Sequence, residues 1–97
     1  MIRLLDAVIL GQAKQSSDQP NIARLAALMT KFPLEVQAYT VHRQCGSGMQ
    51  AVQNAAQEIM CGYADFVLAG GIESMSNAQY YLREARRGYA VGNGILL

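Results

Sequence analysis

The chain has little charge and few cysteines, and both scarcities restrict what it can be. Charged residues make up 15% of the 97 residues, against about a quarter in an average globular domain, whereas 52% are apolar. So few charged residues cannot cover the surface of a monomer well. The composition therefore indicates a piece of a larger structure. The net charge of +1 gives no basic field that would attract nucleic acid.

Other absences exclude further classes. No apolar run approaches the ~18 residues that a membrane-spanning helix needs, and the start lacks the pattern of a signal peptide. Cys45 and Cys61 flank one predicted helix and would lie about 24 Å apart, so we expect two free thiols. With one histidine and no Cys-x-x-Cys pair, no zinc site is expected. We therefore expect a cytoplasmic protein with no membrane and no nucleic-acid partner.

Strand and helix patterns alternate along the chain. Strands are predicted at about residues 5–11, 36–43 and 64–69, which are rich in Val, Ile, Leu and aromatic residues. Apolar residues at helical spacing predict helices from residue 22 to before Pro33 and over 46–61. The order β-α-β-α-β predicts an α/β fold with a parallel sheet.

The cysteine at position 45 occupies a special place in this order. The segment 40–51 (Thr-Val-His-Arg-Gln-Cys-Gly-Ser-Gly-Met-Gln-Ala) places Cys45 between a strand and a long helix. The positive end of a helix and its unpaired N–H groups favour a thiolate and can hold a developing oxyanion. Gly46 and Gly48 leave room for an acyl carbonyl beside the sulfur. A lone cysteine is more often a small buried hydrophobe, so the residues of this segment leave both roles open.

Two motifs resemble the thiolase family, the acyl-CoA C-acyltransferases. They are residues 45–51 (Cys-Gly-Ser-Gly-Met-Gln-Ala) and 69–76 (Ala-Gly-Gly-Ile-Glu-Ser-Met-Ser), and the resemblance covers roughly residues 6–94. It implies that Cys45 is the catalytic nucleophile that carries the acyl group. It also implies coenzyme A thioesters as substrates, no separate cofactor, a homo-oligomer (dimer or tetramer) and a place in fatty acid metabolism.

The resemblance implies the β-α-β-α-β portion of a layered α/β/α/β/α fold. Residues 1–76 would be a partial N-terminal domain without the family's first strand and helix, and 77–97 the start of its loop domain. Thiolases are several times longer, and their activating histidine and second, acid/base cysteine would lie outside this chain. We therefore expect a fragment of an enzyme that forms or cleaves 3-ketoacyl-CoA, inactive alone.

Two other interpretations remain. The chain could be a truncated or orphan domain that only packs or oligomerises. It could also be related to the ketoacyl synthases, which share the thiolase fold but follow their cysteine with a different short pattern, so the two motifs favour thiolases.

Several polar residues near the motifs have competing roles. Side chains alternate along a strand, so we expect His42 to pack or form hydrogen bonds rather than to touch the sulfur of Cys45. Glu73 is expected to satisfy backbone donors rather than to orient the site. Arg24 and Arg43 are expected to tie helix ends or loops together.

The topology predicts where the two motifs meet. Each follows a parallel strand, and we expect these two strands to be neighbours, so that Cys45 and segment 70–73 face one crevice at the carboxyl ends. Gly70 and Gly71 are expected to form a sharp exit from the strand. A basic cluster follows at Arg83, Arg86 and Arg87, with Glu84 among them, and is expected to be an exposed or partner-facing helix end.

Overall fold

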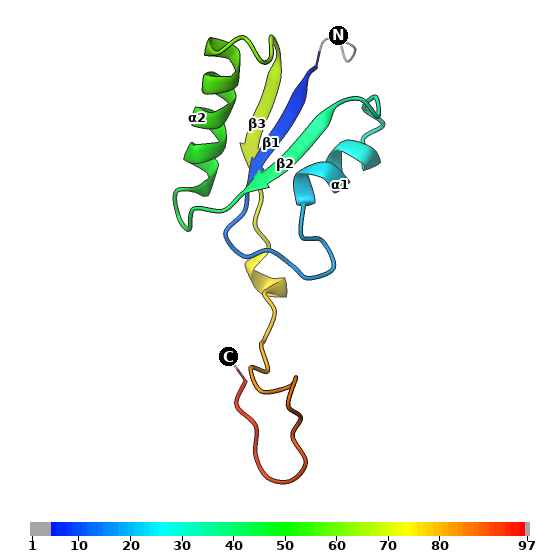
Figure 1. Cartoon of the computed structure of the whole chain (residues 1–97), viewed down its shortest axis with the longest axis vertical. Helices are drawn as coiled ribbons and strands as arrows, with labels where there is room; N and C mark the ends of the chain where they lie inside the picture. The colour runs from blue at the N-terminus through cyan, green and yellow to red at the C-terminus, as the bar shows by residue number, and fades with distance from the viewer. Residues whose placement is uncertain (1–4, 97) are drawn as a thin grey trace.

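The computed structural model describes residues 5–96 and contains a three-stranded parallel sheet with one helix on each face (Figure 1). The strands are β1 (Ala7–Gly11), β2 (Gln37–Val41) and β3 (Val67–Gly71). The helices are α1 (Ile22–Met29), α2 (Ser47–Met60) and the short 3-10 helix η2 (Met75–Asn77). The predicted β-α-β-α-β order and parallel sheet are confirmed.

The strand order, however, differs from the expectation. The order is β2-β1-β3, so the two strands that precede the motifs are not neighbours. Ile9 of β1 pairs with Tyr39 on one side and with Ala69 on the other. The fully buried Ile9 explains this order, because the most apolar strand occupies the centre, where both of its edges are paired.

The glycines at the end of β3 also behave differently from the prediction. Gly70 and Gly71 do not form a sharp exit but belong to the strand, where they pair with Leu10 and Gly11. The predicted strand at 64–69 therefore begins and ends later, at Val67 and Gly71. The Asp6 carboxylate accepts hydrogen bonds from the backbone of Asp65 and Phe66, the two residues before Val67, and so holds the segment from which β3 begins.

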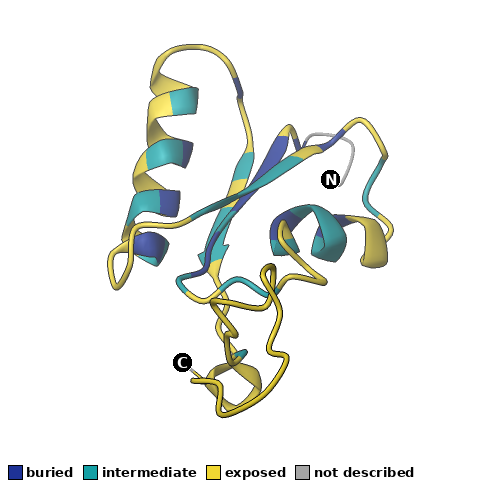
Figure 2. Cartoon of the chain, turned by 60° about the horizontal axis from the view of Figure 1, so that its bottom comes forward, coloured by how far each residue is buried: buried dark blue, intermediate teal, exposed yellow. Residues whose placement is uncertain are grey.

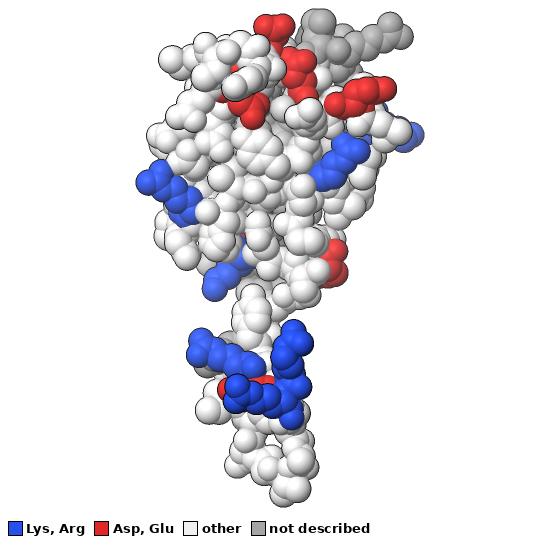
Figure 3. Space-filling model, in the orientation of Figure 1, with Lys and Arg blue, Asp and Glu red and all other residues white. Residues whose placement is uncertain are grey.

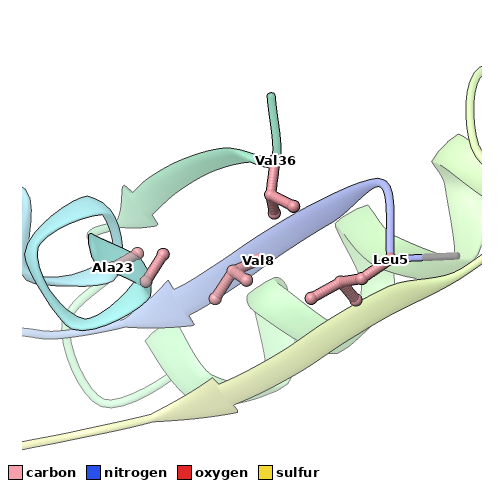
Figure 4. Packing of buried hydrophobic residues seen from close by; sticks show 5 residues of the cluster. Leu5, Val8, Ala23 and Val36 are labelled. Carbon is pink, nitrogen blue, oxygen red and sulfur yellow. The ribbon is translucent and has the colours of Figure 1, made fainter. Parts of the chain in front are cut away.

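Each helix covers its own face of the sheet with small and branched side chains. On the α1 face, Leu5, Val8, Ala23, Ala27 and Val36 form one buried cluster, which Figure 4 shows along β1. On the α2 face the buried residues are Ile9, Ala51 and Ala55, with partly buried residues of β2 and β3 around them. Figure 2 shows the buried positions on β1 and on the inner sides of both helices. Alanines on these helices bring the helix backbone close to the sheet.

Side-chain hydrogen bonds hold the beginning of α1, and a left-handed residue follows its end. Asn21 caps the helix, its Oδ1 accepting from the backbone N of Arg24 at 3.3 Å. Thr40 of β2 donates to the same oxygen at 2.7 Å. The Arg24 guanidinium donates to the Val36 carbonyl at 2.8 Å, which confirms its structural role. The helix begins at Ile22 and ends at Met29, before Pro33 as predicted, and the chain leaves it through Lys31, which has a left-handed conformation with φ 63°.

The C-terminal arm, residues 78–96, projects from the sheet and lies apart from the buried core (Figure 1). The radius of gyration is 17.2 Å, against about 12.5 Å for a compact domain of this length. Figure 3 shows basic side chains gathered on this arm. Arg83, Arg86 and Arg87 are exposed as expected, but they lie on turns and not at a helix end. The division into domains 1–76 and 77–97 stays a prediction.

No helix within residues 5–96 is both long enough and apolar enough to span a membrane.

Asp6 links the beginnings of β1 and β3. Its Oδ2 accepts from the backbone N of Asp65 at 2.7 Å and from that of Phe66 at 3.1 Å. These bonds favour the ionised form and hold the pKa of Asp6 below its ordinary value of 3.8. Because the folded pKa is lowered, the stabilisation is present above pH 3.8 and is lost as the pH falls through the lowered pKa.

We expect Asp6→Asn to lower the melting temperature at neutral pH, because a neutral oxygen accepts these two bonds more weakly. The difference from the parent chain should shrink below pH 3.8 and vanish once Asp6 is protonated. Thermal melts from neutral pH to below pH 3.8 measure this difference in melting temperature. Glu35→Gln is the control, because it removes the same charge from an exposed side chain. A difference that stays constant across the range would contradict the role of Asp6.

Candidate active site

Cys45 lies in a closed turn between β2 and α2. The backbone N of Gly46 donates to the Arg43 carbonyl at 2.9 Å, and that of Ser47 donates to the Gln44 carbonyl at 3.2 Å. The buried Ser47 hydroxyl accepts from the backbone N of Arg43 at 2.8 Å and donates to the Gln44 carbonyl at 2.7 Å. Four hydrogen bonds therefore fix the backbone on both sides of Cys45, while its own side chain is exposed.

The residue before Cys45 has an unusual backbone conformation. Gln44 has φ 50°, in the left-handed region that glycine favours. Within residues 5–96, Lys31 is the only other non-glycine residue with positive φ. Gln44 therefore turns the chain sharply between strand and helix, and it does so immediately before the candidate nucleophile.

A hollow of about 450 Å³ opens beside Cys45 at the carboxyl ends of the strands. Its lining residues come from the ends of all three strands and the beginning of α2: Gly11, Ala13, Gln44, Cys45, Ser47, Gly48, Gly71, Ile72, Glu73 and Met75. The two motifs therefore do face one crevice, as predicted, although β1 lies between their strands. They meet because every parallel strand ends at the same edge of the sheet.

Gly11 allows α2 to begin directly on the sheet. A Cβ on Gly11 would lie 2.6 Å from the backbone N of Gly48 and closer still to the carbonyl of Ser47. A Cβ on Gly71 would make only ordinary contacts, at 3.5 Å from the Gly11 carbonyl oxygen and 3.8 Å from the Gly48 Cα. The first two residues of α2, Ser47 and Gly48, line the hollow, and the Ser47 N–H is already bonded to the Gln44 carbonyl.

Glu73 connects two of the strand ends. Its Oε1 accepts from the backbone N of Ala13 at 2.8 Å, and its Oε2 accepts from that of Lys14 at 3.1 Å. The prediction that Glu73 satisfies backbone donors is thus confirmed. It joins the segment after β3 to the segment after β1 and so shapes the wall of the hollow.

The other sequence candidates lie outside the hollow. His42 is exposed and is not among its lining residues. The Arg43 guanidinium donates to Gln50 of α2 at 2.5 Å, so it ties the turn to the helix as expected. Cys61 follows the far end of α2, and both cysteines are free, as predicted. Among residues 5–96, no three His, Cys, Asp or Glu residues lie together in a way that would hold a metal ion.

Sequence reasoning did not identify the parts that Gly11, Gln44 and Ser47 play in this site. A glycine that ends a buried strand was a signal for close approach at Gly11. No comparable signal exists at Gln44, because its left-handed conformation follows from the closed turn and not from its own preference. Ser47 was visible within the motif, but its two hydrogen bonds appear only in three dimensions.

The sequence profile described as "Thiolase, N-terminal domain" matches residues 2–97. The chain belongs to the thiolase family. Among curated thiolase-family relatives, it is 43% identical over 93 residues to a probable acetyl-CoA acetyltransferase of Escherichia coli K12, covering 96% of this chain and 24% of that protein. It is 41% identical over 92 residues to a probable acetyl-CoA acyltransferase of Staphylococcus epidermidis, covering 95% of this chain and 23% of that protein.

A solved thiolase-family structure confirms the fold. The crystal structure of the Bacillus anthracis acetyl-CoA acetyltransferase matches with a TM-score of 0.93 and 44% sequence identity. The match covers 99% of this chain and 24% of that one. The chain thus spans about a quarter of the length of the thiolases that it matches.

We expect Gly11→Ala to destabilise the fold by about 2 kcal/mol or more, because the added methyl group would push α2 away from the sheet. Urea unfolding measures the change. Gly70→Ala is the matched control, since its Cβ would meet only the end of the Leu10 side chain at 3.4 Å. If both variants lost the same free energy of unfolding, the close approach of α2 to Gly11 would not account for the effect of the added methyl group.

Gln44 provides a test of the turn. Gln44→Val should cost about 1–3 kcal/mol in unfolding free energy, because a β-branched residue strongly disfavours positive φ. Gln44→Gly should stay close to the parent, since glycine adopts this conformation readily. Gln37→Val, the same substitution within strand β2, controls for the loss of the amide. A Gln44→Val variant as stable as Gln44→Gly would refute the strained turn.

Proposed function

We propose that the chain supplies the nucleophile of an acyl-CoA C-acyltransferase, with Cys45 as the catalytic residue. The observation that carries this proposal is the place of the exposed thiol, which sits on a closed turn at the beginning of α2, beside a hollow at the carboxyl ends of three strands. The acetyl-CoA acetyltransferase and acyltransferase names of the relatives support the same chemistry.

In the first half-reaction, the Cys45 sulfur attacks the carbonyl carbon of an acyl-CoA thioester. The bond from that carbon to the sulfur of coenzyme A breaks, the coenzyme leaves as its thiol with one proton in place of the proton that the Cys45 thiol gives up, and the acyl group remains on Cys45. The N–H groups at the start of α2 would stabilise the oxyanion that forms in between. In the second half-reaction, the enolate of another acyl-CoA attacks the acyl-cysteine, releases 3-ketoacyl-CoA and frees the Cys45 sulfur. The reverse direction cleaves 3-ketoacyl-CoA.

The two half-reactions require an acid or base for proton transfer, and the residues that line the hollow offer no free one. Glu73 is the one carboxylate among the residues that line the hollow, and both of its oxygens accept backbone N–H groups. His42 is not among the lining residues. We therefore infer that the 97-residue chain by itself accepts an acyl group but does not turn over.

The setting of this activity is also part of the proposal. We place it in the cytoplasm and in fatty acid metabolism, with acyl-CoA substrates, no separate cofactor and a homo-oligomeric enzyme, dimer or tetramer. The two free thiols suit a reducing compartment. Exposed apolar side chains on the outer face of α2 suit an assembly, because they would be covered there; they are Met49, Val52, Ile59 and Met60.

The same apolar face favours the second candidate function, a domain that only packs or associates. The two candidates differ in one property, the chemical reactivity of Cys45 toward a thioester.

Intact-mass measurement before and after incubation with acetyl-CoA distinguishes them. We expect one acetyl group on the parent chain and on Cys61→Ser, and none on Cys45→Ser, because only the thiol at position 45 lies beside the hollow. Continued release of free coenzyme A after the single acetylation is not expected. A parent chain that gains no acetyl group, or a Cys45→Ser variant that gains as much as the parent, would favour the packing domain.

A further inference from the structure

A row of polar side chains begins at the Cys45 turn and follows one side of α2. The Arg43 guanidinium donates to Oε1 of Gln50 at 2.5 Å. Nε2 of Gln50 donates in turn to Oδ1 of Asn54 at 2.7 Å. The row therefore begins within the turn that holds Cys45, two residues before the cysteine.

The row continues onto the sheet and back to the helix. Asn54 donates from Nδ2 to the hydroxyl oxygen of Tyr39 at 3.4 Å, and the Tyr39 hydroxyl donates to Oε1 of Glu58 at 3.3 Å. Partial burial, together with the nearby charge of Glu58, raises the pKa of Tyr39, so its hydroxyl keeps the proton that it donates. We call these five residues the polar row: Arg43, Gln50, Asn54, Tyr39 and Glu58.

The polar row joins the same two elements that the Cys45 turn joins. Gln50, Asn54 and Glu58 follow one another at four-residue spacing and so share one stripe of α2. The neighbouring stripe contains the buried Ala51 and Ala55, which pack on the sheet. Tyr39 lies in β2, and Arg43 follows that strand. The row therefore borders the apolar contact of α2 on the side of β2.

Arg43 is attached to α2 by two separate contacts. Its backbone N donates to the Ser47 hydroxyl at 2.8 Å, and its side chain reaches Gln50, about one helical turn further along. The packing of Ala51 and Ala55 on the sheet holds the middle of α2. The contact from Arg43 to Gln50 adds a hold on the first turn of the helix, close to Ser47 and Gly48, which line the hollow.

We propose that Arg43 and Gln50 are positioning residues, which hold the start of α2 at the angle that Cys45 needs. This inference rests on the proposed function, because it concerns the geometry of that same nucleophile. Both side chains lie at the surface or are half-buried, so their loss should disturb the turn more than the fold. That difference makes the inference testable.

The test uses the full 97-residue chain and the alkylation of its two cysteines by iodoacetamide. Cys61, at the other end of α2, is the internal reference within each molecule. In Gln50→Leu, we expect the alkylation rate of Cys45 to fall about threefold, because a loosened turn holds the sulfur less often beside the N–H groups of α2. The rate at Cys61 and the melting temperature should change little.

Three variants control this measurement. Gln53→Leu makes the same substitution at an exposed position of the same helix and should leave both rates unchanged. Gln50→Glu keeps an acceptor for Arg43 and should restore the Cys45 rate. Arg43→Met removes the contact from its other end and retains the backbone bond to Ser47, so it replaces Gln50→Leu if that variant does not fold.

An unchanged Cys45 rate in folded Gln50→Leu, an equal fall at both cysteines, or an equal fall in Gln53→Leu would overturn the positioning role. Alkylation requires no acyl transfer, so the two proposals can fail separately. A chain that is not acetylated, but whose Cys45 alkylation depends on Gln50, would refute the acyl-transfer proposal and leave the positioning of Cys45 supported.

Discussion

The close approach of α2 to the carboxyl ends of β1 and β3 is the constraint on which the site depends. At Gly11 a single added carbon would collide with the backbone of Ser47 and Gly48. A helix pressed so near the sheet places its first N–H groups at the edge where parallel strands end. The loops after all three strands then meet around one hollow, and Cys45 lies at its rim.

This constraint also explains the strain and the hydrogen bonds around Cys45. The chain must pass from the end of β2 to the start of α2 within a few residues, which requires the left-handed conformation of Gln44. Such a conformation persists only where surrounding contacts over-determine it. Here the Ser47 hydroxyl closes the turn, and Arg43 ties it to the helix through Gln50. The turn is therefore held by the elements on both of its sides.

Local patterns predicted the helices and strands well, because the spacing of apolar residues within one segment is enough to indicate its secondary structure. An apolar run ended by Gly11 becomes β1, and apolar residues at helical spacing become α2. The adjacency of strands was predicted wrongly, since pairing joins segments far apart in the chain and depends on which strand is most deeply buried. The roles of Glu73 and Arg24 were predicted correctly because a carboxylate accepts, and a guanidinium donates, hydrogen bonds that backbone groups next to the strands require. The basic cluster on the C-terminal arm was expected on a helix and lies on turns, where no core face organises it.

By itself, the sequence determined the family, the parallel α/β architecture and the candidate nucleophile, because motifs and hydrophobic periodicity are local properties of the chain. Only the tertiary structure decided the central place of β1, the close approach of α2 at Gly11 and the polar row along α2. Each of these depends on residues that are distant in sequence, such as Gly11 and Gly48 or Tyr39 and Glu58. Their contacts exist only after the sheet and helices have packed, and for that reason no local pattern could reveal them.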